Sequence, residues 1–423
     1  MTDTTNRSLF ERARKVIPGG VNSPVRAFGS VGGDPYFVER AEGAYVWDVE
    51  GNRYIDYVQS YGASILGHAH PRVVAAVSGA AAKGTTYGKP TESEVRLAEE
   101  LVERVDGLEM VRLVSSGTEA AMSAVRLARG VTGRDKVVKF AGNYHGHSDS
   151  LLAAGGSGVA NQGLSGSVGV TAGAVADTVV APYNVVPEID DSVACVIVEP
   201  VAANMGLVPP VEGFLEALRT ACNRADALLV FDEVITGYRL ERGGATGRFG
   251  VQPDVWCFGK VIGGGLPVGA FGGSSDIMAG LAPLGPVYQA GTLSGNPLAT
   301  AAGLAVLAEL DAAAYGRLTA TATHLAEGLR TVFTAAGVAA VVPQVGPLVG
   351  LFFGEVVPRD YDEARTSVEL GLYAAFFRAM LAEGVALAPG PYEVIFPSLA
   401  HSAADIDATL AAAAKAATAL ADP

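Results

Sequence analysis

The sequence is poor in cysteine, with only Cys195, Cys222 and Cys257 among 423 residues. These three are widely spaced and have apolar neighbours, so they offer neither a disulfide framework nor a Cys-x-x-Cys metal pair. The chain also lacks an apolar N-terminal signal and an uninterrupted apolar run of about 18 residues, so we expect no membrane span. Together these absences predict a soluble, cytoplasmic globular protein.

Basic residues are scarce as well. The net charge is −14, and the cluster Arg12, Arg14 and Lys15 fits the solvated side of a first helix. A nucleic-acid partner, which needs a basic surface, is therefore not expected. Four motifs of common enzyme classes are also missing: G-x-G-x-x-G, G-x-x-x-x-G-K-[ST], G-x-S-x-G and H-E-x-x-H.

Apolar residues make up 49% of the chain, enough for large cores in two or three domains. From about residue 65 to 310, short apolar runs alternate with helical segments. This alternation predicts an α/β fold in which a mainly parallel sheet lies between helices. We predict an N-terminal arm (1–64) with a hairpin that turns at residues 50–52, a large α/β domain (65–310) and a smaller C-terminal α+β domain (311–423).

Ligands of such sheets lie beyond the carboxyl ends of the strands, so the residues after each apolar run are the candidates. One run continues into Ser116-Gly117-Thr118-Glu119, small residues that lead into a helix whose free N–H groups would suit a phosphate. A capping box between Ser116 and Glu119 explains the same residues, and both interpretations can hold together.

A second run is followed by Tyr144, whose ring could lie flat on a planar cofactor. The flanking His145-x-His147 has the spacing of a metal pair, which His68-x-His70 repeats. A third ligand of defined spacing is missing, so capping or orienting hydrogen bonds are the better explanation of these histidines.

Two further strand ends carry charged residues. Asp232 follows a buried run, where it could cap a helix or hold a ring nitrogen in its protonated state. Lys260 is one of only seven lysines and the only one between positions 140 and 414. It stands between a buried run and a Gly-Gly-Gly turn, where partial desolvation would lower its pKa and favour attack on a carbonyl. Although most lysines lie on surfaces, this combination of groups is the one that pyridoxal phosphate requires.

At this point the sequence resembles the fold-type I, class III pyridoxal-phosphate aminotransferases over nearly its whole length. Within that family the resemblance is to the branch of the glutamate-1-semialdehyde aminomutases. The segments that carry it are PGGVNSPVRAF, GHAHP, SSGTEAAMSAVRLAR, YHGHSD, VEPVAANMGLVPP, FDEVITGYR, FGKVIGGGLPVGA, AGTLSGNP and SLAHSAADID. Tyr61 is a departure, because the family often has tryptophan in the segment before GHAHP.

The resemblance implies roles for individual residues around pyridoxal 5'-phosphate or pyridoxamine 5'-phosphate. Lys260 would be the Schiff-base lysine, Asp232 the partner of the pyridinium nitrogen and Tyr144 the stacking ring. Thr292 would reach the phosphate of a neighbouring subunit, which implies a homodimer with shared active sites. The remaining cofactor-binding residues would be Ser116, Gly117, Thr118, Glu199 and Asn204.

The substrate-binding residues implied by the resemblance are Ser23, Arg26, Ser157 and Glu393. Ser157 belongs to a Gly/Ser-rich stretch that resembles the family's mobile active-site loop, although a simple connector would have the same composition. Transaminases of this class commonly hold an α-carboxylate with an arginine near the position of Glu393. An acid there suits a substrate that presents an amino group.

The activity implied is the conversion of (S)-4-amino-5-oxopentanoate (glutamate 1-semialdehyde) to 5-aminolevulinate in tetrapyrrole biosynthesis. It would begin from pyridoxamine phosphate and pass through 4,5-diaminovalerate, with no external amino donor. The resemblance also implies an upstream tRNA-dependent reductase as a transient partner. Two alternatives remain: an ω-aminotransferase with separate donor and acceptor, and a non-catalytic protein that has kept the fold.

Overall fold

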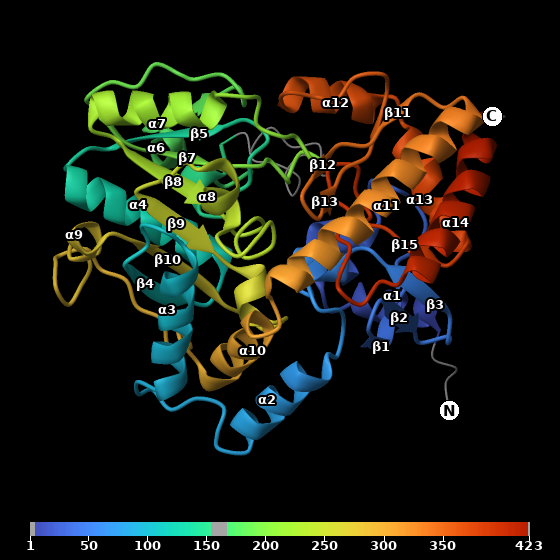
Figure 1. Ribbon diagram of the computed structural model, residues 1–423, viewed down its shortest axis with the longest axis horizontal. Helices are drawn as coiled ribbons and strands as arrows, with labels where there is room; N and C mark the ends of the chain where they lie inside the picture. Colours follow the sequence, from blue (N-terminus) through green and yellow to red (C-terminus); the bar gives the residue numbers. More distant parts are fainter. Residues whose placement is uncertain (1–4, 154–166, 422–423) are drawn as a thin grey trace.

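The computed structural model describes residues 5–153 and 167–421, and its largest sheet has seven strands in the order β4-β10-β9-β8-β7-β5-β6 (Figure 1). β10 is antiparallel to its neighbours β4 and β9, whereas the other neighbouring pairs are parallel. The predicted α/β class with a mainly parallel sheet is confirmed. The strands are β4 (Met110–Val114), β5 (Lys136–Phe140), β6 (Thr178–Ala181), β7 (Val193–Val198), β8 (Leu228–Asp232), β9 (Val255–Phe258) and β10 (Gly269–Gly273).

Helices cover both faces of this sheet. In β7, Cys195 and Ile197 pack with α4 (Gly117–Thr132) on one face, while Val196 and Val198 pack with α7 (Phe214–Ala225) on the other. On the α7 side, α3 (Glu92–Arg104) and α10 (Pro297–Leu307) cover the part formed by β9, β10 and β4. Consecutive side chains of a strand point to opposite faces, so a strand buried on both faces has a continuous apolar sequence.

A four-stranded sheet connects the beginning of the chain to its end. It contains β1 (Val38–Glu42), β2 (Tyr45–Asp48), β3 (Arg53–Asp56) and β15 (Val385–Ala386) in that order. β2 and β3 form the predicted antiparallel hairpin, whose turn contains Gly51 at φ +84°. β15 runs parallel to β3, so residues from the predicted N-terminal arm and the predicted C-terminal domain share one sheet.

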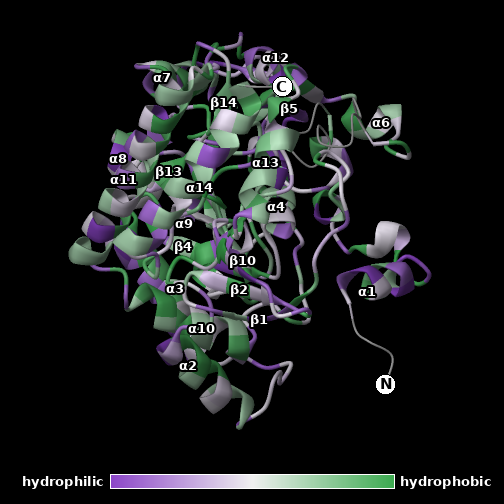
Figure 2. Ribbon diagram, turned by 90° about the vertical axis from the view of Figure 1, so that its right-hand side faces the viewer, coloured by the Kyte–Doolittle hydropathy of each residue, from purple (hydrophilic) through white to green (hydrophobic). Residues whose placement is uncertain are grey.

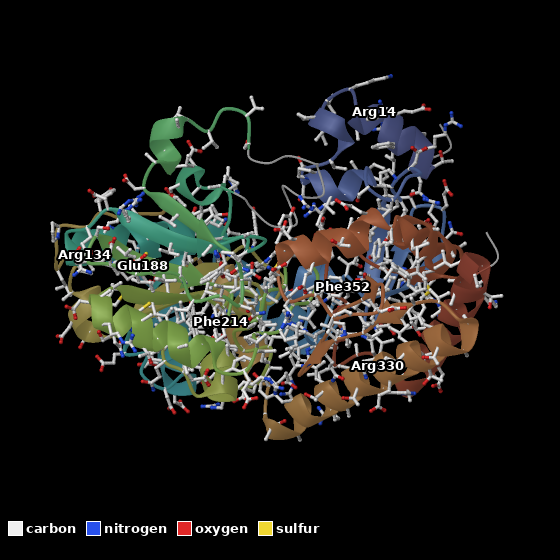
Figure 3. All side chains as sticks on the ribbon, turned by 90° about the horizontal axis from the view of Figure 1, so that it is seen from above. Arg14, Arg134, Glu188, Phe214, Arg330 and Phe352 are labelled. Atoms are coloured by element: carbon white, nitrogen blue, oxygen red, sulfur yellow. The ribbon has the colours of Figure 1, made fainter. Side chains whose placement is uncertain are left out.

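The C-terminal part is mainly helical, with α11 (Ala312–Ala336), α12 (Tyr361–Glu369), α13 (Leu372–Ala382) and α14 (Ala403–Ala421). α11, α13 and α14 share a core that includes Phe28 and Tyr57 from the N-terminal residues. A second core joins this part to the large sheet, because Phe214 of α7 and Phe352 of β14 (Phe352–Phe353) belong to the same buried cluster (Figure 3).

Short elements complete the described chain. Figure 2 shows α1 (Asn6–Ala13) standing off the rest of the molecule, and α1 has no buried residue. The others are α2 (Pro71–Ala81), α6 (Ala172–Val175), α8 (Gly244–Phe249), α9 (Ser275–Met278), β11 (Ala340–Val341), β12 (Gln344–Val345), β13 (Leu348–Val349) and the 3₁₀ turns η1 (Pro18–Gly20), η2 (Pro24–Ala27), η3 (Gln59–Gly62), η4 (Asp149–Leu151) and η5 (Lys260–Gly263).

Among the described residues, no single helix has the length and apolarity needed to cross a membrane. Only α10 and α11, taken together and bent by 82° between them, reach that length and composition.

Candidate active site

The turn between β4 and α4 leaves N–H groups available at the start of the helix. Ser116 is the N-cap of α4, and its hydroxyl accepts from the N–H of Glu119 at 3.2 Å. The Glu119 carboxylate accepts from the N–H of Ser115 at 2.7 Å, one residue earlier than the cap itself. The first N–H groups of a helix have no acceptor within the helix. Gly117 and Thr118 therefore offer two donors at the positive end of the α4 dipole, which suits a phosphate.

The segment after β5 packs directly against that turn. Gly146 adopts φ +83°, and a Cβ atom there would lie 2.5 Å from the Cα atom of Thr118. The ring of His147 lies 3.3 Å from the hydroxyl of Thr118, measured from Nδ1 to Oγ1. Only glycine fits this close approach in a left-handed conformation. Tyr144, two residues earlier, is thereby fixed beside the helix N-terminus.

Asp232 ends β8 and contacts a buried histidine. Its Oδ2 atom lies 2.7 Å from Nδ1 of His145, which is only 1% exposed, and its Oδ1 atom accepts from the N–H of Val234 at 3.1 Å. Burial lowers the pKa of His145, which the carboxylate partly opposes. This contact is a hydrogen bond of the orienting kind that the sequence predicts for this histidine. Asp232 thus keeps a fixed orientation while presenting a carboxylate to the site.

Glu199 follows β7 and organises the opposite wall. It accepts from the backbone N–H groups of Tyr144 and Ala203, each at 2.7 Å, and from the side-chain amide of Asn204 at 2.9 Å. Burial, helped by the charge of Asp232, raises the pKa of Glu199 to about 7. A carboxyl group that binds its proton near neutrality can donate as well as accept hydrogen bonds.

Lys260 follows β9 in a strained conformation. Its φ is +48°, in the left-handed region that lysine seldom adopts. Burial lowers the pKa of its amine, while the charges of Asp232, Glu199 and Glu393 oppose that effect. A lysine with a lowered pKa has more of the neutral, nucleophilic amine at neutral pH.

These groups line one cavity of about 230 Å³ at the carboxyl ends of the strands. A phosphate would bind at the α4 N-terminus, a planar ring beside Tyr144 and a basic ring nitrogen at Asp232, so the residues fit pyridoxal phosphate. Eight predicted cofactor residues lie in this lining: Ser116, Gly117, Thr118, Tyr144, Glu199, Asn204, Asp232 and Lys260.

Four other predicted residues are described and lie outside this cavity lining: Ser23, Arg26, Thr292 and Glu393. Thr292 is exposed and lines a separate hollow with residues 86–91. Arg26 and Glu393 both act electrostatically on Tyr61, and Glu393 also acts on Lys260. Ser23 precedes η2, the turn that contains Arg26. Ser157 lies outside the described residues.

No pattern in the sequence indicates the apolar members of the lining, Val201, Val234 and Ile235. Val234 fills the space beside two glycines: a Cβ atom at Gly117 would lie 3.0 Å from it, and one at Gly259 3.2 Å. An apolar residue in a pocket looks like a core residue in a sequence. Within residues 5–153 and 167–421, no group of three or more His, Cys, Asp or Glu side chains could hold a metal ion.

The family follows from comparison with known proteins. The family model for class-III aminotransferases matches residues 28–417, and the chain belongs to this family. The glutamate-1-semialdehyde 2,1-aminomutase of Desulforapulum autotrophicum is 53% identical over 422 residues, covering 98% of each chain. The enzyme of the same name from Laribacter hongkongensis is also 53% identical, over 97% of this chain and 98% of its own.

Solved structures share the whole fold. An omega-transaminase from Sphaerobacter thermophilus has a TM-score of 0.91 at 32% identity, covering 100% of this chain and 99% of its own. A glutamate-1-semialdehyde-aminomutase variant from Pseudomonas aeruginosa PAO1, in complex with PMP, has a TM-score of 0.86 at 30% identity, with 97% and 93% covered. Both activities therefore occur on this fold, and the site must decide between them.

Proposed function

We propose that this chain converts glutamate 1-semialdehyde into its isomer 5-aminolevulinate, a step of tetrapyrrole biosynthesis. The observation that carries the proposal is the single cavity that brings Lys260, Asp232 and the N-terminus of α4 together. The chain has this cavity and is 53% identical, over nearly its whole length, to two aminomutases of that name.

The cofactor is pyridoxal 5'-phosphate, or pyridoxamine 5'-phosphate in its aminated form. It supplies a carrier for the amino group and a ring that withdraws electrons from the reacting carbon. Gly117 and Thr118 would hold its phosphate through N–H groups, with Ser116 fixing their turn. Asp232, oriented by His145, would keep the ring nitrogen protonated, while Glu199 and Asn204 would form the wall beside Tyr144.

Lys260 would move the proton at the reacting carbon. Burial lowers the pKa of its amine, which favours the neutral form that can accept a proton and return it to the neighbouring carbon. The reaction is balanced without a second substrate, because the amino group moves from C4 to C5 while the carbonyl moves from C5 to C4. Each proton that Lys260 removes is given back within one turnover.

The substrate would lie between Lys260 and the residues around Tyr61. Glu393 would receive its amino group, and Arg26 with Ser23 would hold its carboxylate. Ser157 is proposed as a further contact from outside the described residues. This arrangement distinguishes the mutase from an ω-aminotransferase, which would need a strong site for the carboxylate of a 2-oxo acid at the position of Glu393.

We also propose a cytoplasmic homodimer in which Thr292 completes the phosphate site of the neighbouring subunit. Thr292 is exposed, and beside it Tyr288 and Leu293 are 71% and 50% exposed, which suits a surface covered by a second copy. The proposed division of the chain is an N-terminal arm (1–64), a cofactor-binding domain (65–310) and a C-terminal domain (311–423). An upstream tRNA-dependent reductase would supply the unstable aldehyde by transient contact.

The test is turnover without an amino donor. The purified protein is loaded with pyridoxamine phosphate, glutamate 1-semialdehyde is added alone, and 5-aminolevulinate is measured over many turnovers. Sustained production is expected, because the amino group returns to the cofactor in each cycle. A single burst, or production only after addition of a donor and an acceptor, would instead identify an ω-aminotransferase.

A further inference from the structure

Arg239 is a buried cation without a carboxylate partner. Its side chain is fully buried, and no ion pair to Asp or Glu forms within the described parts of the chain. Its Nη2 donates to the carbonyl of Gly62 at 2.6 Å and its Nη1 to the carbonyl of Pro397 at 3.3 Å. The guanidinium also lies 5.3 Å from the centre of the Phe396 ring. A buried charge is costly, so its retention among carbonyls calls for a functional reason.

The first segment that Arg239 holds is strained. Gln59, Ser60 and Tyr61 have φ values of +43°, +54° and +55°, and Gly62 follows at +95°. Consecutive non-glycine residues in the left-handed region cost free energy and persist only when their surroundings enforce them. Asp56 holds the beginning of this turn by accepting from the N–H of Gln59 at 3.1 Å, and Arg239 holds its end at Gly62.

The second segment is 393–398, which lies against the first. The N–H of Phe396 donates to the carbonyl of Tyr57 at 2.9 Å, and a Cβ atom at Gly62 would lie 2.8 Å from the Phe396 ring. The first segment carries Tyr61 and the second carries Glu393, which acts electrostatically on both Tyr61 and Lys260.

Arg239 itself comes from the loop that follows Asp232. The N–H of Arg239 donates to the carbonyl of Thr236 at 3.1 Å, so the loop is compact between the cofactor carboxylate and the guanidinium. We propose that Arg239 is a positioning residue that fixes Tyr61 and Glu393, the substrate-facing wall, relative to the strand end that holds the cofactor. This inference rests on the proposed function for the identity of the substrate.

The charge of Arg239 also affects the pKa of Lys260, an effect that an uncharged side chain in the same place would not have. Four charged groups act on Lys260: Asp232, Glu199 and Glu393 raise the pKa of its amine, and Arg239 lowers it. Loss of the cation should therefore raise the pKa of Lys260, and the acidic limb of the kcat/KM profile should move to higher pH.

The test compares R239Q and R239K with the control R104Q. Arg104 is also buried and also donates to carbonyls, but these belong to Leu307 and Leu310 and not to the two segments that Arg239 holds. We expect R239Q to raise KM for glutamate 1-semialdehyde by about tenfold to a hundredfold, the range caused by small misplacements of binding groups. Affinity for pyridoxal phosphate, measured by absorbance titration, should stay unchanged. R239K should raise KM but leave the acidic limb in place.

A readout independent of activity is hydrogen exchange followed by mass spectrometry. R239Q should speed exchange in peptides that cover residues 56–66 and 391–400, whereas R104Q should not. Unchanged KM and unchanged exchange in R239Q would overturn the proposal. Equal rises in KM, with equal losses of kcat and cofactor affinity, in R239Q and R104Q would also overturn it.

If R239Q does not fold, the variant G62A replaces it in the test, because it displaces the turn at residues 59–62 without removing the charge of Arg239. It should raise KM and leave the acidic limb in place, and an unchanged KM would overturn the proposal. The wild-type enzyme tests the proposed function separately, since it alone must turn over without a donor. The exchange comparison holds whatever the substrate is.

Discussion

At the scale of single residues, the site combines a strained lysine with carboxyl groups whose protonation is set by burial. Lys260 has φ +48° and a pKa lowered by burial, while Glu199 has a pKa raised to about 7. Groups of opposite type whose pKa values are pushed toward neutrality are typical of sites that transfer protons.

Replacement of Lys260 by alanine should abolish turnover while leaving the phosphate site intact. The only amine of the described cavity lining would be gone, whereas Gly117 and Thr118 are untouched. We expect a loss of about three orders of magnitude or more in kcat, as for other residues that carry the chemical step. Formation of 5-aminolevulinate measures the loss, and retained binding of pyridoxamine phosphate is the control. Near-normal turnover would contradict the assignment.

Glu199 makes stability depend on pH in a direction opposite to most carboxylates. Its pKa is about 7 in the folded protein and near 4.5 when exposed, so the folded state binds more protons between those values. Stability from this group is therefore fully present below about pH 4.5 and is lost as the pH rises through 7.

The variant E199Q should remove this dependence, so thermal unfolding of the cofactor-free protein is compared between pH 5 and pH 8. Relative to E199Q, the wild type should lose stability as the pH rises. Glutamine has one acceptor oxygen fewer than glutamate, and this loss should change the unfolding free energy of E199Q by the same amount at every pH. The exposed E103Q is the control and should run parallel to the wild type. Parallel curves for E199Q as well would contradict the raised pKa.

At the scale of elements, the cofactor site depends on glycines that allow segments from different strands to touch. Gly146 brings the loop after β5 onto the first turn of α4. Gly133, at the C-terminal end of the same helix, also has a positive φ, +68°, but a Cβ atom there would have no neighbour within 4 Å.

The pair G146A and G133A separates backbone strain from close contact. Both should lose about 1 kcal/mol of unfolding free energy from backbone strain, because alanine is disfavoured at positive φ, and G146A should lose more because its Cβ atom would lie 2.5 Å from the Cα atom of Thr118. Only G146A should also lose affinity for pyridoxal phosphate, since its Cβ atom must push Thr118 away from the phosphate site. Absorbance titration and thermal unfolding of both variants provide the comparison. Equal cofactor affinity in the two variants would show that the contact does not matter.

Much of the large sheet could be predicted because strands buried on both faces have continuous apolar sequences. The strands β4, β5, β7, β8, β9 and β10 correspond to the short apolar runs between residues 65 and 310 on which the prediction of the sheet rests. β6 was missed because this short edge strand is only partly buried. The antiparallel direction of β10 could not be predicted, since an apolar run carries no information about direction.

Site residues could be predicted where the chemistry of the site requires a particular residue type. They could not be predicted where only the three-dimensional arrangement of distant segments gives a residue its place. Lys260 and Asp232 were found as charged residues after buried runs. The left-handed turn at residues 59–62 was missed, because Gln59, Ser60 and Tyr61 are not residue types that favour positive φ. Arg239 was likewise missed, because its two acceptors come from positions 62 and 397, far apart in the sequence.

At the scale of the whole molecule, N-terminal and C-terminal residues pack together in one sheet and one core beside the site. β15 pairs with β3, and the core of α11, α13 and α14 includes Phe28 and Tyr57. The cavity lining described above comes from residues 116–260, whereas Tyr61 and Glu393 come from the two ends. The proposed substrate side of the site would therefore depend on residues from both the N-terminal and the C-terminal parts, while the proposed cofactor side depends on the large sheet.

Shared sites in a homodimer can be tested by mixing two inactive variants. K260A lacks the reactive amine, and T292A would lack the contact to the neighbouring phosphate. In a mixed dimer, one site would combine both defects, and the other would have the intact Lys260 of one subunit and the intact Thr292 of its neighbour.

Subunit exchange between purified K260A and T292A should therefore restore cofactor affinity and turnover at up to half of the sites of each mixed dimer. If Thr292 instead acted within its own subunit, every site would keep one defect, and mixing would restore nothing. The variant T331A, at an exposed position of α11, serves as the control in place of T292A, and its own activity should equal that of the wild type.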